Sequence, residues 1–338
     1  MEIENDIQQR IFQAIQIQLP EGDKLANVLQ ELLHLSQDAA YRRLRGDVPL
    51  TIYETKKLCT QFALSFDDFN EFQRGRVQFS YNPLRSIDMN YKSYLTGLRD
   101  GLREVRQLKN AHLIMSINDT PIFQLFNLPH LTRFKFFFWA KTYLQMPEYK
   151  NEKFKREKVD KESLAIGIEA QNLYHSIPSS EIYGPETLRG TLRQIQYYFD
   201  SHLFENPDYA LEILDNLIQL NEHMKIQAEI GHKFTRGNEP VTSGNEFNMY
   251  SNDTYIADNT YLIKWEGGSS VYLSHNIMNY LVTTDPYYCE ESENILTKLI
   301  DNSSLISKIN AKERNHFFGN MERTILNFRR KVEAELEV

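Results

Sequence analysis

The chain has 338 residues, enough for two domains, and its 41% hydrophobic and 25% charged residues are typical of a soluble globular protein. The net charge of −8 argues against a protein that coats nucleic acid through bulk positive charge, although a local basic face is enough to meet phosphates. Two distant cysteines, Cys59 and Cys289, indicate neither a disulfide framework nor a zinc site, and the first residues lack the segments of a secretion signal. We therefore expect a cytoplasmic protein.

Five short helices are predicted at the start of the chain. Apolar residues at helical spacing indicate helices over residues 4–19 and 23–34, and Pro20 ends the first of them. Three further short helices follow before a polar, proline-containing stretch begins near Arg74. Together they predict one compact domain over residues 1–76.

Local capping signals place the last three of these helices. Ser36 is a natural N-cap for a short third helix, which Gly46 ends. Thr51 and Glu54 form a Thr-x-x-Glu capping box that opens the fourth helix. Ser65 caps a fifth, so the pattern is that of a helix-turn-helix with supporting helices.

This domain resembles the phage-repressor-like, xenobiotic-response-element type of helix-turn-helix family over about a fifth of the chain. The later half of the domain matches the family better than the earlier half does, both in where its helices begin and end and in the apolar face of its fourth helix. The apolar positions that fit the contact between the two central helices are Leu29, Leu33, Leu35 and Ala40. Three positions depart: the family usually has a small residue at Gln30, a glycine at His34 and an apolar residue at Arg43, so Arg43 is expected to face phosphate.

The resemblance implies that the helix after Ser36 reads double-stranded DNA in the major groove. Side chains on its exposed face can bond base edges or stack on thymine methyl groups. The expected base-reading residues are Gln37, Asp38, Tyr41, Arg42 and Arg45. The expected contacts to the DNA backbone, which set register without reading sequence, are Arg43, Lys56 and Lys57. The alternative interpretation of the basic cluster is a solvated helix face.

Residues 77–110 are predicted to form a linker and a candidate dimerisation helix. Tyr91, Leu98 and Val105 recur every seven residues in that helix. The repeat fits either a dimerising coiled-coil seam or a helix that packs on its own domain.

Residues 111–338 are predicted to form a larger, helix-dominated α+β domain with a small sheet, so the chain as a whole is mainly α. In chain order we expect a strand over 111–117, a buried aromatic helix within 122–144, a solvated mixed-charge segment over 148–162, further helices to about 232, a hairpin around Gly267-Gly268 and helices near 289–306 and 312–335. Charged residues interrupt the 122–144 segment, so it is not predicted to span a membrane.

No catalytic signature is present in this second domain. The sequence lacks HExxH, a phosphate-binding glycine loop and GxSxG, so we expect no enzyme, cofactor or metal. A candidate ligand pocket comprises Phe137, Trp139, His275 and Asn276. The alternatives are an ordinary aromatic core or a dimer interface and, at Asn276, turn capping.

The sequence therefore predicts a bacterial-type, sequence-specific transcriptional regulator that binds double-stranded DNA as a homodimer. Its C-terminal domain would dimerise and sense a small molecule, a peptide or a protein. One alternative is a protein-interaction adaptor with a degenerate helix-turn-helix, which the acidic net charge supports. Another is a peptide-sensing regulator built on stacked helical repeats, although the sequence shows no repeat of fixed period.

Overall fold

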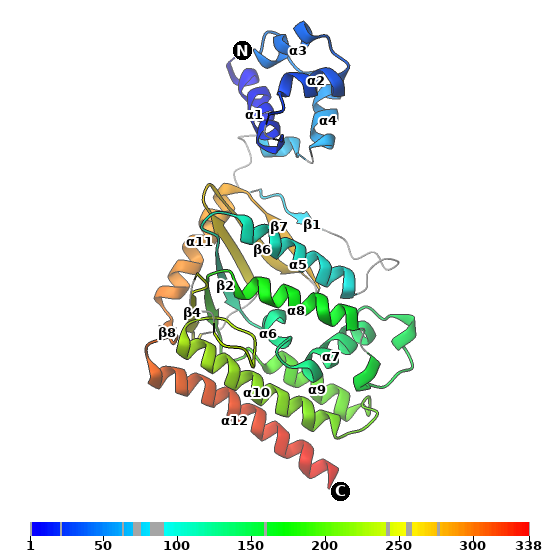
Figure 1. Cartoon of the computed structure of the whole chain (residues 1–338), viewed down its shortest axis with the longest axis vertical. Helices are drawn as coiled ribbons and strands as arrows, with labels where there is room; N and C mark the ends of the chain where they lie inside the picture. The colour runs from blue at the N-terminus through cyan, green and yellow to red at the C-terminus, as the bar shows by residue number, and fades with distance from the viewer. Residues whose placement is uncertain are drawn as a thin grey trace. The chain divides into compact units, whose positions relative to one another are not determined.

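A computed structural model describes the chain except residues 1, 21, 63, 70–75, 82–90, 159–160, 241–243, 255–258, 276–277 and 338. It divides into two compact units, Met1–Gln78 and Phe79–Val338 (Figure 1). Most of the predicted linker region, 77–110, therefore belongs to the second unit. None of the helices among the described residues is long and apolar enough to cross a membrane.

The first unit is helical. Its elements are α1 (Glu2–Gln18), α2 (Leu25–Leu33), α3 (Gln37–Leu44), α4 (Ile52–Gln61) and a final 3-10 turn, η1 (Phe66–Phe69). The Oγ atom of Ser36 accepts a hydrogen bond from the Ala39 amide at 3.3 Å, and the capping box at Thr51 is complete. The caps predicted at Ser36 and Thr51 are thus present, and the fifth predicted helix is the 3-10 turn. The core side chains of this unit are Ile11, Phe12, Ile15, Leu25, Leu29, Ala40, Leu58 and Phe69.

The second unit is built on a mixed sheet of eight strands in the order β1-β7-β6-β5-β2-β3-β4-β8. The strands are β1 (Ser80–Tyr81), β2 (His112–Ile117), β3 (Ser179–Tyr183), β4 (Phe247–Ser251), β5 (Thr260–Trp265), β6 (Gly268–His275), β7 (Asn279–Thr283) and β8 (Ser304–Leu305). The pairs β2–β3 and β3–β4 are parallel, and the other pairs are antiparallel.

Two strand predictions had different outcomes. The predicted hairpin is confirmed: β5 and β6 pair antiparallel, and Gly267 turns the chain between them at φ +96°. The prediction that helices continue to about residue 232 is wrong at β3. All five residues of Ser179–Tyr183 are buried and three are polar, so this strand shows none of the polar–apolar alternation by which a half-buried strand is recognised.

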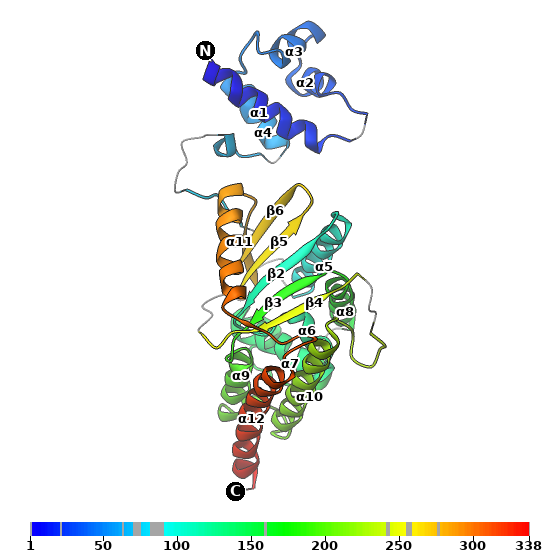
Figure 2. The same cartoon turned by 90° about the vertical axis from the view of Figure 1, so that its left-hand side faces the viewer.

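Helices cover both faces of the sheet. They are α5 (Tyr91–Gln107), α6 (Ile122–Leu125), α7 (Pro129–Phe138) with a π-helical turn (Trp139–Tyr143), 3-10 turns at Pro147–Tyr149 and Arg156–Lys158, α8 (Lys161–His175), α9 (Arg189–Asp200), α10 (Tyr209–Ile230), α11 (Pro286–Asp301) and α12 (Ala311–Leu336). Figure 2 shows α11 on one face, with α5 and α8 on the other. Cys289 and Leu296 of α11 pack on Ile182, Leu262 and Val271 of the sheet.

The helix with the heptad pattern, α5, packs on its own unit. Leu95, Leu102 and Val105 are buried in the main core, and α5 lies against α8. The structure thus shows the second of the two arrangements that the repeat allowed. Most of the apolar face of α5 is covered within one chain.

A buried network of charged and polar side chains is centred on Glu181 of strand β3. The Glu181 carboxylate accepts hydrogen bonds from the hydroxyls of Ser179 at 2.7 Å, Tyr174 at 2.5 Å and Tyr183 at 2.7 Å. The Lys233 Nζ atom lies 3.6 Å from Glu181 Oε1 and donates to Ser179 at 2.9 Å. Burial lowers the pKa of Lys233 to about 8, although Glu181 opposes that change. Every charge in this network has a partner, as a buried ion pair requires.

We predict that Glu181→Gln destabilises the second unit by about 3–5 kcal/mol, because it leaves the buried ammonium of Lys233 without its carboxylate. Both tryptophans, Trp139 and Trp265, lie in this unit, so urea denaturation followed by tryptophan fluorescence reports on it alone. The control is Glu266→Gln, which removes an exposed ion pair with Lys109 and should leave the denaturation midpoint unchanged. Equal midpoints for the two variants would contradict the role given to Glu181.

Candidate nucleic-acid interface

The turn between α2 and α3 contains a residue in the left-handed conformation that is not glycine. His34 ends α2 in the left-handed conformation, at φ +56° and ψ +45°, and its amide bonds to the Gln30 carbonyl. The Leu35 amide bonds to the same carbonyl at 3.1 Å. His34 therefore holds a left-handed conformation at the position where the sequence resemblance led us to expect glycine. The side-chain amide of Gln30 folds back onto its own helix at Ala26.

One face of α3 is anchored and the opposite face is exposed. Ala40 is fully buried and Leu44 packs against the same core. The residues predicted to read bases, Gln37, Asp38, Tyr41, Arg42 and Arg45, are all exposed. Arg45 lies just beyond the last helical residue and forms an ion pair with Asp47 at 2.9 Å. The structure therefore brings these five side chains together on and beside one helix.

The expectation that Arg43 is free to face phosphate does not fit its surroundings. Its Nη2 atom pairs with Glu54 Oε1 at 2.7 Å, and only 14% of its side chain is exposed. The other oxygen of Glu54 accepts from the Thr51 amide at 2.8 Å. Burial opposes ionisation of Glu54, but the hydrogen bonds from Thr51 and Arg43 outweigh it and lower the pKa of that carboxyl. Arg43 thus ties α3 to the capping box of α4, and Leu44 provides the apolar contact.

The first turns of α4 add exposed side chains. Lys56 and Lys57, predicted to contact the DNA backbone, are both exposed. Ile52 and Tyr53, which no sequence prediction singled out, are each 85% exposed in the turn before them. The signal for these two was their position directly after the Thr51 cap, where a helix has no preceding turn of its own to cover them.

Two glutamines of α1 that the sequence reasoning missed contact the end of α3. The Gln8 Nε2 atom donates to the carbonyls of Arg43 at 2.7 Å and Val48 at 3.2 Å, while Oε1 accepts from the Leu50 amide at 2.7 Å. Gln9 donates to the carbonyl of Leu44 at 2.9 Å. The available signal was the position of Gln8, a polar residue in the helical stripe that continues through Ile11, Phe12 and Ile15.

The candidate ligand pocket of the second unit is not formed by the predicted residues. Phe137 is fully buried and Trp139 is 7% exposed; both belong to the aromatic core, which was the alternative interpretation. His275 is exposed at the end of β6, where its ring contacts that of Tyr81. Asn276 lies outside the described residues. Phe137 and Trp139 thus share the core, and His275 lies apart from them on the surface.

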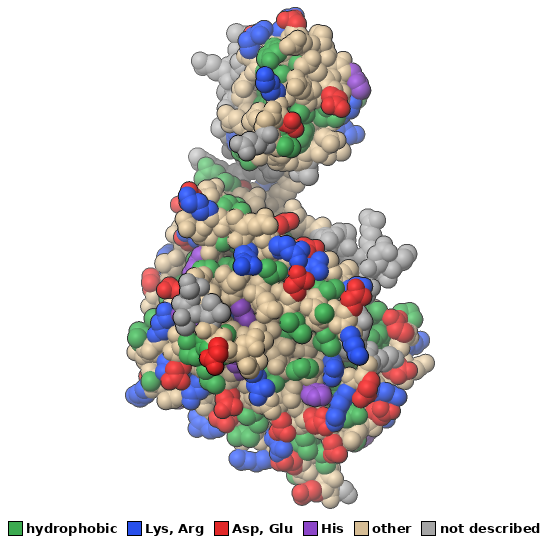
Figure 3. Space-filling view, in the orientation of Figure 1, with side chains coloured by type: hydrophobic (Ala, Val, Ile, Leu, Met, Phe, Trp, Pro, Cys, Tyr) green, Lys and Arg blue, Asp and Glu red, His purple; other side chains and the backbone are tan. Residues whose placement is uncertain are grey.

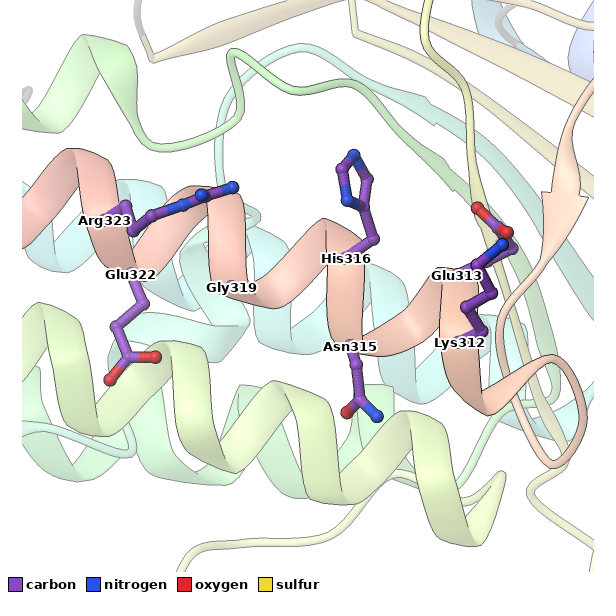
Figure 4. A pocket seen from close by; sticks show the side chains of 7 residues that line it. All are labelled: Lys312, Glu313, Asn315, His316, Gly319, Glu322 and Arg323. Carbon is purple, nitrogen blue, oxygen red and sulfur yellow. The ribbon is translucent and has the colours of Figure 1, made fainter.

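Two surface hollows lie on the second unit. One, of about 720 Å³, lies along α12 and is lined by Lys312, Glu313, Asn315, His316, Gly319, Glu322 and Arg323. Figure 4 shows that Asn315 and Glu322 point away from His316 and Arg323, so the side chains do not converge. The other, of about 560 Å³, is lined by residues of α5 and α8. The described residues contain no cluster of side chains suited to a metal ion.

No protein-family model matches this chain, and comparison with characterised proteins and with solved structures gives no significant match. What the first unit does must therefore be inferred from its own geometry.

We predict that His34→Gly stabilises the first unit by about 1 kcal/mol, because glycine adopts the left-handed conformation without the steric cost that histidine bears there. Native-state hydrogen exchange of amides in α2 and α3 provides the measurement. Faster exchange in the variant would show instead that the imidazole stabilises the turn by more than its backbone costs.

Proposed function

We propose that this chain is a sequence-specific DNA-binding transcriptional regulator whose first unit reads the major groove through α3. The observation that carries the proposal is the face of α3 itself. Five side chains able to contact bases are exposed on one side, while Ala40 and Leu44 hold the other side on the core. The alternative, a solvated helix face, would not by itself account for Gln, Tyr and Arg side chains gathered on one face directly after an N-cap and a helix-turn-helix turn.

The dimensions and chemistry of α3 suit this role. An α-helix with its side chains is about 10–12 Å across, which matches the width of the major groove, about 12 Å. Gln37 near the N-terminal end can make a bidentate contact to adenine, and Arg42 and Arg45 can do so to guanine. The ion pair between Arg45 and Asp47 is exposed on both sides, so a base edge can displace it at small cost.

Positive charge is local in this protein. Lys56 and Lys57 on α4 supplement Arg42 and Arg45, although the chain as a whole carries −8. In the view of Figure 3, blue and red side chains alternate over the second unit, so this face offers no continuous basic surface to DNA. We therefore assign the phosphate contacts to the first unit, through Lys56 and Lys57, and omit Arg43.

An eight-residue reading helix covers about one half-site, so a homodimer with two such helices would bind a palindromic operator. We assign the dimer contacts and the recognition of a small-molecule, peptide or protein effector to the second unit. The separate core of that unit supports a division of labour within the chain.

The test is selection of bound duplexes from random DNA at physiological salt, with wild-type protein and with Arg42→Ala and Arg45→Ala. We expect a palindromic motif, and each variant should lose about 1–3 kcal/mol of affinity for it because one bidentate base contact is removed. Arg193→Ala, at an exposed position on α9, is the matched control and should bind as wild type does.

Full sequence-specific affinity in both arginine variants would contradict the residue assignment. If the wild-type protein selects no motif at low or physiological salt, the first unit does not read DNA. The protein-interaction adaptor would then be the better account of the chain.

A further inference from the structure

The carboxamide of Gln8 is buried in the first unit, where an apolar side chain would be expected. Only 6% of the residue is exposed, and it precedes Ile11, Phe12 and Ile15 on the face of α1 that contacts the core. Its two N–H groups and its oxygen make the three hydrogen bonds described above, with acceptors and a donor 35 to 42 residues away. A glutamine side chain with its polar atoms satisfied in this way is specifically oriented.

These bonds meet α3 at the end where its backbone needs partners. The last carbonyls of a helix have no intrahelical donor. The carbonyl of Arg43 accepts from Gly46 and from Gln8, and the carbonyl of Leu44 accepts from Gln9. Side chains of α1 thus complete the C-terminal end of α3.

The apolar contacts of α1 and its hydrogen bonds do different things. Burial of Ile11, Phe12 and Ile15 stabilises the association of α1 with the rest of the unit, but it is non-directional and sets orientation weakly. Hydrogen bonds weaken steeply as their angles depart from linearity. Gln8 and Gln9, beside the Arg43–Glu54 ion pair, therefore constrain the tilt and axial rotation of α3, and with them the directions of Arg42 and Arg45.

We propose that Gln8, assisted by Gln9, is a positioning residue for base reading, and that it acts through the backbone of α3 without touching DNA. This inference rests on the proposed function. Bidentate contacts to a base edge depend on both distance and angle, whereas phosphate contacts tolerate small rotations of the helix. Loss of the glutamine contacts should therefore reduce the preference for the correct sequence more than it reduces general affinity for DNA.

The test compares full-length wild-type, Gln8→Met and Gln16→Met proteins on the selected motif and on a scrambled duplex at one salt concentration. Methionine keeps the length of glutamine but cannot make these hydrogen bonds, and Gln16 is an exposed glutamine of the same helix. Gln8→Met should bind the motif about tenfold more weakly, since part of a bidentate contact is lost, with the scrambled duplex bound within about twofold of wild type. Gln16→Met should match wild type on both duplexes.

Equal loss on the two duplexes, or no loss on either, would overturn the positioning role. Gln9→Met removes a single bond and provides a milder variant if thermal melting shows that Gln8→Met does not fold. Residual dipolar couplings of α3 amides, measured without DNA, should report a changed helix orientation in Gln8→Met and none in Gln16→Met. If wild-type protein prefers no sequence, the proposed function fails, and these couplings still decide whether Gln8 orients α3.

Discussion

The short third helix depends on hydrogen bonds at both of its ends. A helix of eight residues is not stable by itself in water, because nucleation costs more than so few bonds return. Ser36 satisfies an amide at the N-terminal end, and Gln8 and Gln9 bond to carbonyls at the other end. The exposed face can consist of polar residues because these contacts, together with burial of Ala40, hold the helix.

The same contacts show which features could be predicted from the sequence. Ser36, Thr51 and Glu54 act within four residues along the chain, so their spacing alone identified them. The bonds of Gln8 join residues far apart in sequence, and only the fold brings them together. The ion pair of Arg43 is of the same kind, because its partner Glu54 lies eleven residues away across a turn. Sequence spacing does not reveal this pair, so the sequence alone predicts a phosphate contact for Arg43.

In the second unit, too, features set by contacts between residues far apart in the sequence could not be predicted. The β5–β6 hairpin has a local turn signal and was predicted, whereas β3 lies between two parallel neighbours and contains the buried Glu181. Its polar residues are accommodated because Tyr174 and Lys233 meet the Glu181 carboxylate from other elements of the fold, and Tyr183 meets it from the same strand. Phe137 and Trp139 likewise have the residue types of a pocket, and they fill a core.

The central claim is that the exposed face of α3 contacts DNA bases. The most direct test is photo-crosslinking of full-length protein to its selected duplex, with p-benzoylphenylalanine replacing Tyr41 in one sample and Tyr197 in another. Both tyrosines are exposed, at 39% and 54%, but Tyr197 lies on α9 of the second unit. Crosslinks to DNA from position 41 and none from position 197 are the predicted result. Absence of crosslinks from position 41 under conditions where the duplex is bound would contradict the assignment of α3 as the reading helix.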